Sequence, residues 1–380
     1  MKIKLKQAFD LQMGKTPARN QAENWGGNHR WVSIADIGNA EKYIAKTKEC
    51  ITDAGINASG IKVVPQGTVI MSFKLSIGKT AITAQDMYTN EAIIAFIDKK
   101  IFEIDPNYLY HLCCGTDWTA GTNKAVMGLT LNKATLLEKE IPLPDICQQR
   151  KIAAKLDKID AIIADRQQQL TMIEQAVKSR FIELFGDPVS NSYGLPEATL
   201  SDLGEFGRGV SKHRPRNDIK LLGGKYPLIQ TGDVANAGLY ITSYGNTYSE
   251  LGLRQSKMWD KGTLCITIAA NIAKTAILEF DACFPDSVVG FIANERTNNI
   301  FIHYWFSFFQ EILESQAPES AQKNINLKIL SELKVIVPEK RKQDEFASFV
   351  KLTDKSKLAV QQGLQELETL KKSLMQQYFG

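Results

Sequence analysis

The chain has 380 residues and a formal net charge of +4 at pH 7, with 44% of its residues hydrophobic and 23% charged. This length leaves room for two or three domains with ordinary cores, and the composition is typical of a soluble globular protein rather than a disordered one. There is no N-terminal apolar segment of the signal-peptide kind and no run of about eighteen apolar residues. We therefore expect a cytoplasmic protein without a membrane span.

Residues 1–145 have the texture of a mixed α/β domain. Short β-branched and apolar runs, such as KVVPQGTVIMSF at 62–73 and EAIIAFI at 91–97, alternate with glycine, asparagine, aspartate and proline. This pattern predicts short strands joined by loops, with an occasional helix such as PNYLYHLCC at 106–114.

A loop near the N-terminus is the first candidate binding segment. The stretch MGKTPARNQAENWGGNHRW carries Lys15, Arg19 and Arg30 close to Trp25 and Trp31. Cations on an exposed loop can neutralise phosphates or contact base edges, but a merely solvated loop has the same composition, so both interpretations stay open. We expect the tryptophans to anchor the core or the loop rather than to stack on bases.

The run SIGKTAI, which contains Gly78 and Lys79, resembles the end of a phosphate-binding loop. Such a loop requires G-x-x-x-x-G-K-[ST], and the residue five positions before Gly78 is Phe73. KTAI recurs in the second half after Ala273 instead of glycine, which argues further against a phosphate cradle. Lys79 and Lys274 are therefore candidates for isolated phosphate contacts or for residues that end a strand.

Two long helices are predicted, over residues 146–186 and 339–380. Apolar residues recur there at spacings of four and three without an intervening proline, which indicates a coiled-coil-like stripe. The predicted seam consists of Ile152, Leu156, Ile159, Ile163, Leu170, Ile173, Val177, Val350, Val360, Leu364, Leu367 and Leu374. A helix of this kind is about 50–60 Å long, and its narrow stripe is too long to be buried by one small domain. We expect the two helices to pair antiparallel, with packing of each helix on its own domain as the alternative.

The second half of the chain repeats the first at an offset of 194–197 residues. IADIGNA at 34–40 matches TGDVANA at 231–237, and EAIIAFI at 91–97 matches DSVVGFI at 286–292. The fold prediction is α+β: two similar mixed α/β domains separated by an antiparallel pair of long helices, as a pseudo-twofold internal repeat. Its segments are domain 1 (1–145), helix 1 (146–186), domain 2 (187–338) and helix 2 (339–380).

The second half contains the more basic of the candidate loops, GRGVSKHRPRNDIKLLGGKY at 207–226. Its glycines and proline predict an exposed irregular segment, and its cations could contact phosphates or base edges. The candidates in it are Arg208, Lys212, His213, Arg214, Arg216 and Lys225. A solvated charge run is again the alternative.

The sequence offers no candidate catalytic or metal site. It has no [ND]-P-P-[YF] loop of an amino-methyltransferase, no D…E-x-K set of a metal nuclease, no G-x-S-x-G and no H-E-x-x-H, and its cysteines form no C-x-x-C pair. We therefore expect a non-catalytic chain without a cofactor or metal of its own.

The order of several motifs resembles the specificity subunit of type I restriction-modification enzymes. These motifs are G-K-T-P (14–17), W-G-G…W-V (25–32), G-T-V-I…I-G-K-T-A (67–81) and I-P-L-P…Q-Q-R-K-I-A (141–153), followed by a long helix that returns in the second copy. The resemblance covers essentially the whole chain. It implies two target recognition domains that each contact one half of a split, asymmetric site in double-stranded DNA, with the paired helices as a ruler between them.

The same resemblance implies partners. Modification (methyltransferase) subunits that use S-adenosylmethionine would dock on the helices, and a restriction subunit that uses ATP with Mg is possible. The second copy departs from the first, since it has GVSK in place of GKTP, and VIVPEKRKQDEF in place of the IPLP…QQR segment. The alternative function is a non-enzymatic coiled-coil scaffold or inhibitor that binds modification subunits without contacting DNA.

Overall fold

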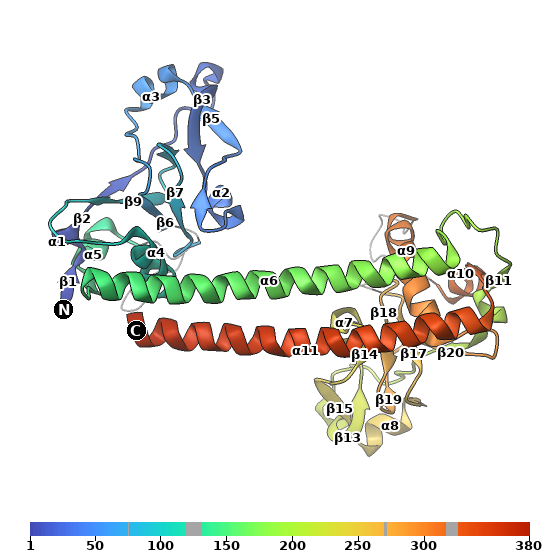
Figure 1. The fold of residues 1–380 in the computed structure, drawn as a ribbon. Helices are drawn as coiled ribbons and strands as arrows, with labels where there is room; N and C mark the ends of the chain where they lie inside the picture. Colours follow the sequence, from blue (N-terminus) through green and yellow to red (C-terminus); the bar gives the residue numbers. More distant parts are fainter. Residues whose placement is uncertain (75, 119–130, 270–271, 317–325) are drawn as a thin grey trace. The chain divides into compact units, whose positions relative to one another are not determined.

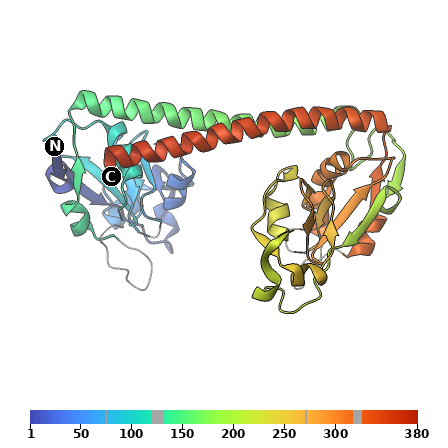
Figure 2. The same ribbon diagram turned by 90° about the horizontal axis from the view of Figure 1, so that it is seen from below.

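The computed structural model describes residues 1–74, 76–118, 131–269, 272–316 and 326–380. The chain forms two compact units. Unit 1 contains residues 1–167 together with 362–380, and unit 2 contains residues 168–361. Both chain ends therefore belong to unit 1 (Figure 2).

Unit 1 is built on a five-stranded sheet with the order β2-β9-β6-β7-β4 and a three-stranded sheet with the order β5-β3-β8 (Figure 1). Its strands are β1 (Lys2–Lys4), β2 (Phe9–Met13), β3 (Trp25–Val32), β4 (Tyr43–Ile44), β5 (Glu49–Ile51), β6 (Val69–Ser72), β7 (Thr80–Thr83), β8 (Tyr88–Thr89), β9 (Ile93–Asp98) and β10 (Glu140–Pro142). Its short helices are α1 (Leu5–Ala8), η1 (Ala22–Asn24), α2 (Ile34–Asn39), α3 (Asp53–Ser59), α4 (Pro106–Gly115) and α5 (Lys133–Glu138).

The central strands of this sheet are buried because both of their faces are covered. All four residues of β6 and of β7 are buried. One face packs under α4, which begins where Asp105 accepts hydrogen bonds from the backbone N–H groups of Asn107 and Tyr108. A proline at the first helical position of α4 fits the same start signal.

Unit 2 has the same plan, with sheets of order β12-β20-β17-β18-β14 and β15-β13-β19-β16. Its strands are β11 (Glu197–Thr199), β12 (Gly204–Arg208), β13 (Leu222–Leu228), β14 (Tyr240–Ile241), β15 (Asn246–Tyr248), β16 (Met258–Trp259), β17 (Leu264–Thr267), β18 (Thr275–Leu278), β19 (Ala282–Cys283), β20 (Val288–Ala293) and β21 (Lys334–Ile336). Its short helices are η2 (Leu200–Asp202), η3 (Ile219–Leu221), α7 (Thr231–Asn236), α8 (Glu250–Arg254), α9 (Asn299–Gln316) and α10 (Leu327–Glu332).

The predicted internal repeat is confirmed by strand order and by register. In unit 1 the parallel pair β4–β7 aligns Ile44 with Thr83, and in unit 2 the parallel pair β14–β18 aligns Ile241 with Leu278. Both β3 and β13 also carry a bulge at the corresponding place. The two copies therefore share a scaffold although their sequences have diverged.

One glycine is common to the two loops that carry the candidate cations, and the structure shows why. A Cβ at Gly14 would lie 1.9 Å from the carbonyl oxygen of Thr89, and a Cβ at Gly209 would lie 2.2 Å from that of Phe284. No side chain fits at either position. GKTP and GVSK thus differ everywhere except at the residue that the backbone requires.

The two predicted long helices are α6 (Ile146–Phe185) and α11 (Lys340–Phe379). Within unit 1, Lys371 of α11 pairs with Asp160 of α6. Within unit 2, Lys357 lies 2.7 Å from Glu174. Also within unit 2, Arg180 lies 2.6 Å from Glu345, so the partner's number falls along α11 as the residue number rises along α6. The helices therefore run antiparallel there, as predicted.

Each helix also contributes to a domain core at both of its ends. In unit 1, Leu156 of α6 and Met375 of α11 belong to one apolar cluster with the sheet, and in unit 2 the same holds for Phe181 and Phe346. The long helices therefore pair with each other, as expected, and also pack on a domain, as the alternative had it, at different places along their length. Every predicted seam residue is buried or partly buried.

A fully buried glutamine fixes the start of each long helix. In unit 1 the Gln149 side chain accepts a hydrogen bond from the N–H of Asp105 and donates to the carbonyl oxygens of Glu103 and Pro144, at 2.9–3.0 Å. In unit 2 Gln343 bonds in the same way at the start of α11. It accepts from the Thr297 hydroxyl and donates to the carbonyl oxygens of Arg296 and Pro338. Although the second copy departs from the IPLP…QQR form, it keeps the spacing from proline to glutamine and with it the buried residue.

In the part of the chain that the structure describes, no helix has both the length and the apolar character needed to cross a bilayer.

Candidate nucleic-acid interface

The basic loop of unit 2 connects β12 to η3 and is held at its start on two sides. The N–H groups of Gly209 and Val210 donate to the carbonyl oxygens of Val288 and Phe284, next to β20 and β19. On the other side the Ser256 hydroxyl donates to the carbonyl oxygen of Val210. The loop therefore starts from a rigid base although most of its side chains are exposed.

Two arginines of this loop share one carboxylate. Arg216 forms a short ion pair with Asp286, and Nη2 of Arg214 lies 3.6 Å from the other oxygen of the same carboxylate. Arg214 also donates to the carbonyl oxygens of Ser211 and His213, at 2.6 and 2.8 Å. Asp286 is 70 residues away in the sequence and was not predicted as part of the site.

The remaining predicted cations lie in this loop or on the strands beside it, Arg208 on β12 and Lys225 on β13, and they differ in their contacts. His213 lies 3.1 Å from Asp218, and Lys225 lies 3.5 Å from Glu250. The side chains of Arg208 and Lys212 are exposed and have no hydrogen-bond or ion-pair partner among the described residues.

The structure adds one cation that the sequence analysis missed. The Lys257 ammonium lies 3.8 Å from the centroid of the Trp259 ring. The preceding residues, Gln255 and Ser256, bond directly to the basic loop: the N–H of His213 donates to the Gln255 side chain at 3.0 Å. No local sequence signal joins segments about 40 residues apart, so only the fold could bring Lys257 to this site.

In unit 1 the corresponding loop presents its arginine on an aromatic support. The guanidinium carbon of Arg19 lies 3.9 Å from the Trp25 ring centroid and 5.0 Å from that of Trp31. Arg19 is also paired bidentately with Glu49, whose hydrogen bond raises the arginine's pKa. The two indole N–H groups donate to the carbonyl oxygens of Ala18 and Lys15, so the tryptophans anchor the loop, as expected.

The other predicted cations of unit 1 have modest contacts. Lys15 donates to the carbonyl oxygen of Ser59 at 3.0 Å, next to a small open pocket, and Arg30 lies 3.6 Å from the Cys50 sulfur. A carboxylate, Glu91, accepts a short hydrogen bond from the Thr16 hydroxyl in this loop. Glu91 occupies the position that Asp286 has in unit 2, directly before the last strand of the main sheet.

The KTAI segments form β-hairpins, which rules out the phosphate-binding loop. Gly78 and Ala273 both have positive φ at the end of the turn, and β7 and β18 follow where a phosphate-binding loop would be followed by a helix. Residues 270 and 271 of the second hairpin lie outside the described residues. Lys274 donates to Gln310 of α9 at 3.0 Å, and Lys79 lies exposed beside Gly38 of α2. Neither lysine belongs to a basic loop.

In unit 1 a partly buried ion pair ties α6 to the sheet. The Lys42 ammonium lies 2.6 and 2.8 Å from the two Asp157 oxygens, and Nε2 of His111 lies 2.6 Å from the same carboxylate. Burial would raise the pKa of Asp157, but the hydrogen bonds from Lys42 and His111 lower it below its usual value. Burial lowers the pKa of His111, so the histidine is neutral near pH 7 and donates to the carboxylate.

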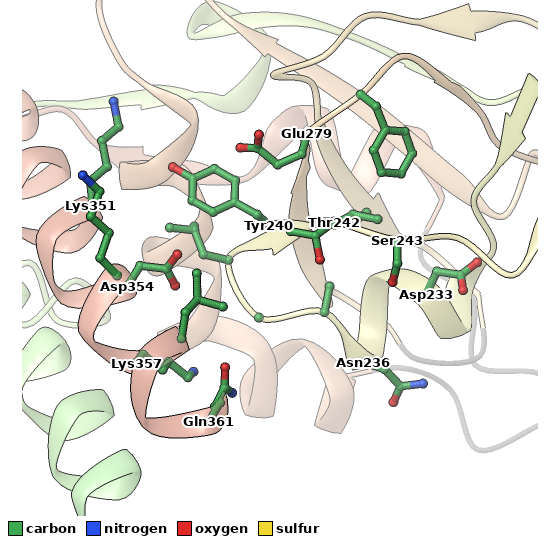
Figure 3. Close-up of a pocket in the computed structure, with 17 residues that line it drawn as sticks. Asp233, Asn236, Tyr240, Thr242, Ser243, Glu279, Lys351, Asp354, Lys357 and Gln361 are labelled. Atoms are coloured by element: carbon green, nitrogen blue, oxygen red, sulfur yellow. The ribbon is translucent and has the colours of Figure 1, made fainter. Parts of the chain in front are cut away.

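In unit 2 the corresponding place is an open cleft of about 970 Å³ between the sheet domain and α11 (Figure 3). Asp354 and Lys357 project into it from α11, opposite Tyr240 and Glu279. Burial and the nearby Glu279 raise the pKa of Asp354, while Lys357 opposes this shift. The two copies therefore differ in the contact between the sheet domain and the long helix.

Among the described residues, no three histidine, cysteine, aspartate or glutamate side chains come together as a metal site.

A family model described as the type I restriction modification DNA specificity domain matches residues 1–175 and again residues 196–369. The chain belongs to this family. The two matches coincide with the two structural copies, and each match includes most of the long helix that ends its copy.

Curated members of the family match in part. The MjaIX specificity subunit of Methanocaldococcus jannaschii is 26% identical over 274 residues, which are 67% of this chain and 62% of that one. The EcoR124I/EcoR124II specificity subunit of Escherichia coli is 26% identical over 157 residues, 39% and 38% of the two chains. The chain thus aligns with less than two thirds of the length of these relatives.

Solved structures agree in fold over the whole chain. The crystal structure of a type I restriction-modification S subunit from M. genitalium has a TM-score of 0.60 at 15% identity, and the match covers 100% of this chain and 96% of that one. A chain from a structural study of complex assembly and conformational transition of the type I R-M system also scores 0.60, at 16% identity, and covers 100% and 97%. At this identity the likeness concerns the fold.

Proposed function

We propose that the chain is the DNA-sequence-specificity subunit of a type I restriction-modification system. Each specificity domain would contact one half of an asymmetric, two-part target in double-stranded DNA. The observation that carries this proposal is the combination of equal scaffolds with unequal loops: the strand orders agree, whereas one loop presents Arg19 on two tryptophans and the other presents Arg214 and Arg216 on a carboxylate. Two copies that must recognise different sequences need this combination.

The long helices would set the gap between the half-sites and would bind the modification subunits. This part of the proposal is supported by large apolar side chains that stay exposed on them: Leu370 within unit 1, and Met172, Leu352 and Leu358 within unit 2. Exposed apolar groups of this size favour burial against a partner. Methyl transfer from S-adenosylmethionine, and ATP-dependent cleavage with Mg if a restriction subunit takes part, would belong to those partners. The chain would act in the cytoplasm without catalysing a reaction itself.

Selection from a random duplex pool tests the proposal. The chain, purified with a modification subunit, is incubated with DNA that carries a long randomised segment, and the bound fraction is sequenced. We expect a motif of two short specified parts at a constant separation, and binding that weakens steeply as salt rises. A bound pool without sequence preference would contradict DNA recognition and would favour the scaffold or inhibitor.

A methylation readout tests the same idea in cells. Deletion of the gene should abolish adenine methylation at a two-part motif in the host genome, and re-expression of the chain should restore it. Methyl transfer or cleavage by the purified chain alone would show that it is an enzyme, contrary to the proposal.

A further inference from the structure

The arginines of the unit 2 loop are not equivalent, although the sequence presents them as a pair. Arg214 donates to two acceptors, the carbonyl oxygens of Ser211 and His213, and its Nη2 also lies 3.6 Å from the carboxylate of Asp286. Both acceptors belong to its own loop, so the Arg214 side chain folds back and braces the backbone. Both Nη1 hydrogens are used and Nη2 faces Asp286, so fewer of its five N–H donors remain for a ligand than on Arg216.

Arg216 has one partner. Its Nη2 donates to Asp286, and its Nε and Nη1 groups have no hydrogen-bond partner among the described residues. A guanidinium held at one corner keeps most of its five N–H donors available in a fixed plane. Two parallel donors of this kind match the O6 and N7 acceptors of guanine in the major groove.

Asp286 requires an explanation of its own. A carboxylate within a cluster of cations weakens attraction to phosphates, so its effect on non-specific DNA binding is unfavourable. It stands directly before β20, next to the backbone of residues 284 and 288 that anchors the start of the loop. It therefore joins the arginines to the most rigid part of the sheet.

The corresponding acid in unit 1 makes a related contact. Glu91 precedes β9 as Asp286 precedes β20, and it binds the Thr16 hydroxyl in the loop that follows β2. In both copies an acid at this turn holds the loop that carries the candidate cations, but only in unit 2 does it accept hydrogen bonds from arginine.

We propose that Arg216 contacts a guanine of the DNA half-site bound by unit 2, and that Asp286 and Arg214 are positioning residues that fix its guanidinium plane. This inference rests on the proposed function and adds to it separate roles for the residue that contacts the base and the residues that position it. Asp286 lowers general affinity for DNA and raises the preference for one base pair, because an arginine that is already oriented loses less conformational freedom on binding.

The test first uses the wild-type chain with its modification subunit to obtain the two-part motif from the random pool. Duplexes in which each specified base pair is replaced in turn then give the preference at every position, alongside an unrelated duplex for non-specific binding. Arg216→Lys keeps the charge but cannot make two parallel hydrogen bonds. We expect it to reduce the preference at one G·C pair by about 10- to 100-fold, with non-specific binding unchanged.

Asp286→Asn should reduce the preference at the same pair while non-specific affinity stays equal or rises, since one negative charge is lost. In the Arg216→Lys background it should have little further effect on that preference, because the aspartate acts through the arginine. Glu91→Gln is the matched control: it changes the equivalent acid of unit 1 and should leave this pair untouched.

Three results would overturn the assignment. Arg216→Lys could leave the preference at every position intact, Asp286→Asn could lower specific and non-specific binding equally, or its effect could persist in the lysine background. Failure of the wild-type chain to select any motif would instead remove the proposed function itself, and this inference with it.

Discussion

The buried glutamine at the start of α6 should be worth far more to stability than its exposed neighbour. Gln149→Ala removes one acceptor and two donors, which leaves the N–H of Asp105 and the carbonyl oxygens of Glu103 and Pro144 without their partners. The side chain is fully buried. A buried donor or acceptor left unpaired costs about 1–3 kcal/mol, so three such groups should lower the free energy of unfolding of unit 1 by at least about 3 kcal/mol.

Gln148→Ala is the matched control. The Gln148 side chain is exposed and has no hydrogen-bond partner among the described residues, so its loss should change stability by less than about 0.5 kcal/mol. Native-state hydrogen exchange followed by mass spectrometry would measure both variants, because peptides from β9 and α4 report the stability of unit 1 separately from unit 2.

The equivalent substitution in the second copy tests whether the loss of stability is confined to the unit that contains the glutamine. Gln343→Ala should lower protection by a similar amount, but in peptides from β20 and α9 of unit 2. Equal protection in Gln149→Ala and Gln148→Ala would refute the argument, because the three hydrogen bonds would then contribute nothing beyond an exposed amide.

Three further predictions concern the helices and the core. Phe181→Ala should destabilise unit 2 by about 3–5 kcal/mol in denaturant unfolding, because this ring is fully buried. Its control, Ile182→Ala, removes a side chain that is 43% exposed and should cost about 1 kcal/mol or less. Equal losses of stability in the two variants would contradict the packing. Burial lowers the pKa of His303 to about 4, so the stability that depends on the neutral ring is complete above about pH 6.5 and is lost as pH falls through 4. His303→Gln, which can still bond to Thr275, should remove at most about 3 kcal/mol of this acid sensitivity, and an unchanged pH profile of unfolding would refute the assignment. One heptad inserted into each long helix at the unit boundary should widen the gap between the two parts of the selected DNA motif by about three base pairs, since seven residues add about 10 Å. An unchanged gap would exclude a role of the helices in setting that distance.

Local sequence patterns were sufficient for much of the fold. The spacing of apolar residues located both long helices, and the offset between the copies predicted the repeat that the strand orders confirm. Phe73 stands where a phosphate-binding loop requires glycine, which argued against such a loop, and the structure has a β-hairpin with Gly78 in its turn instead. These features depend on residues that are neighbours in the chain, so their signal survives without knowledge of the fold.

The candidate site could be predicted from the sequence only in part. The two basic loops were visible as charge runs, but the sequence could not distinguish an arginine that bonds to its own loop backbone, such as Arg214, from one that bonds only to a carboxylate, such as Arg216. It also could not bring in Lys257, which joins the site from a segment about 40 residues further along. Many acids in the chain could pair with these cations, and their identity depends on which turn the sheet places beside the loop.

The sequence by itself thus determined the repeat, the class of its domains and the helical rods, because hydrophobic periodicity and turn residues act over a few residues at a time. Only the tertiary structure decided the partners: Asp286 for Arg216, Glu49 for Arg19, and the last turn of α11 for the core of unit 1. Contacts between distant segments are selected by how sheets and helices pack as a whole. No single pair of residues carries that information in its own spacing.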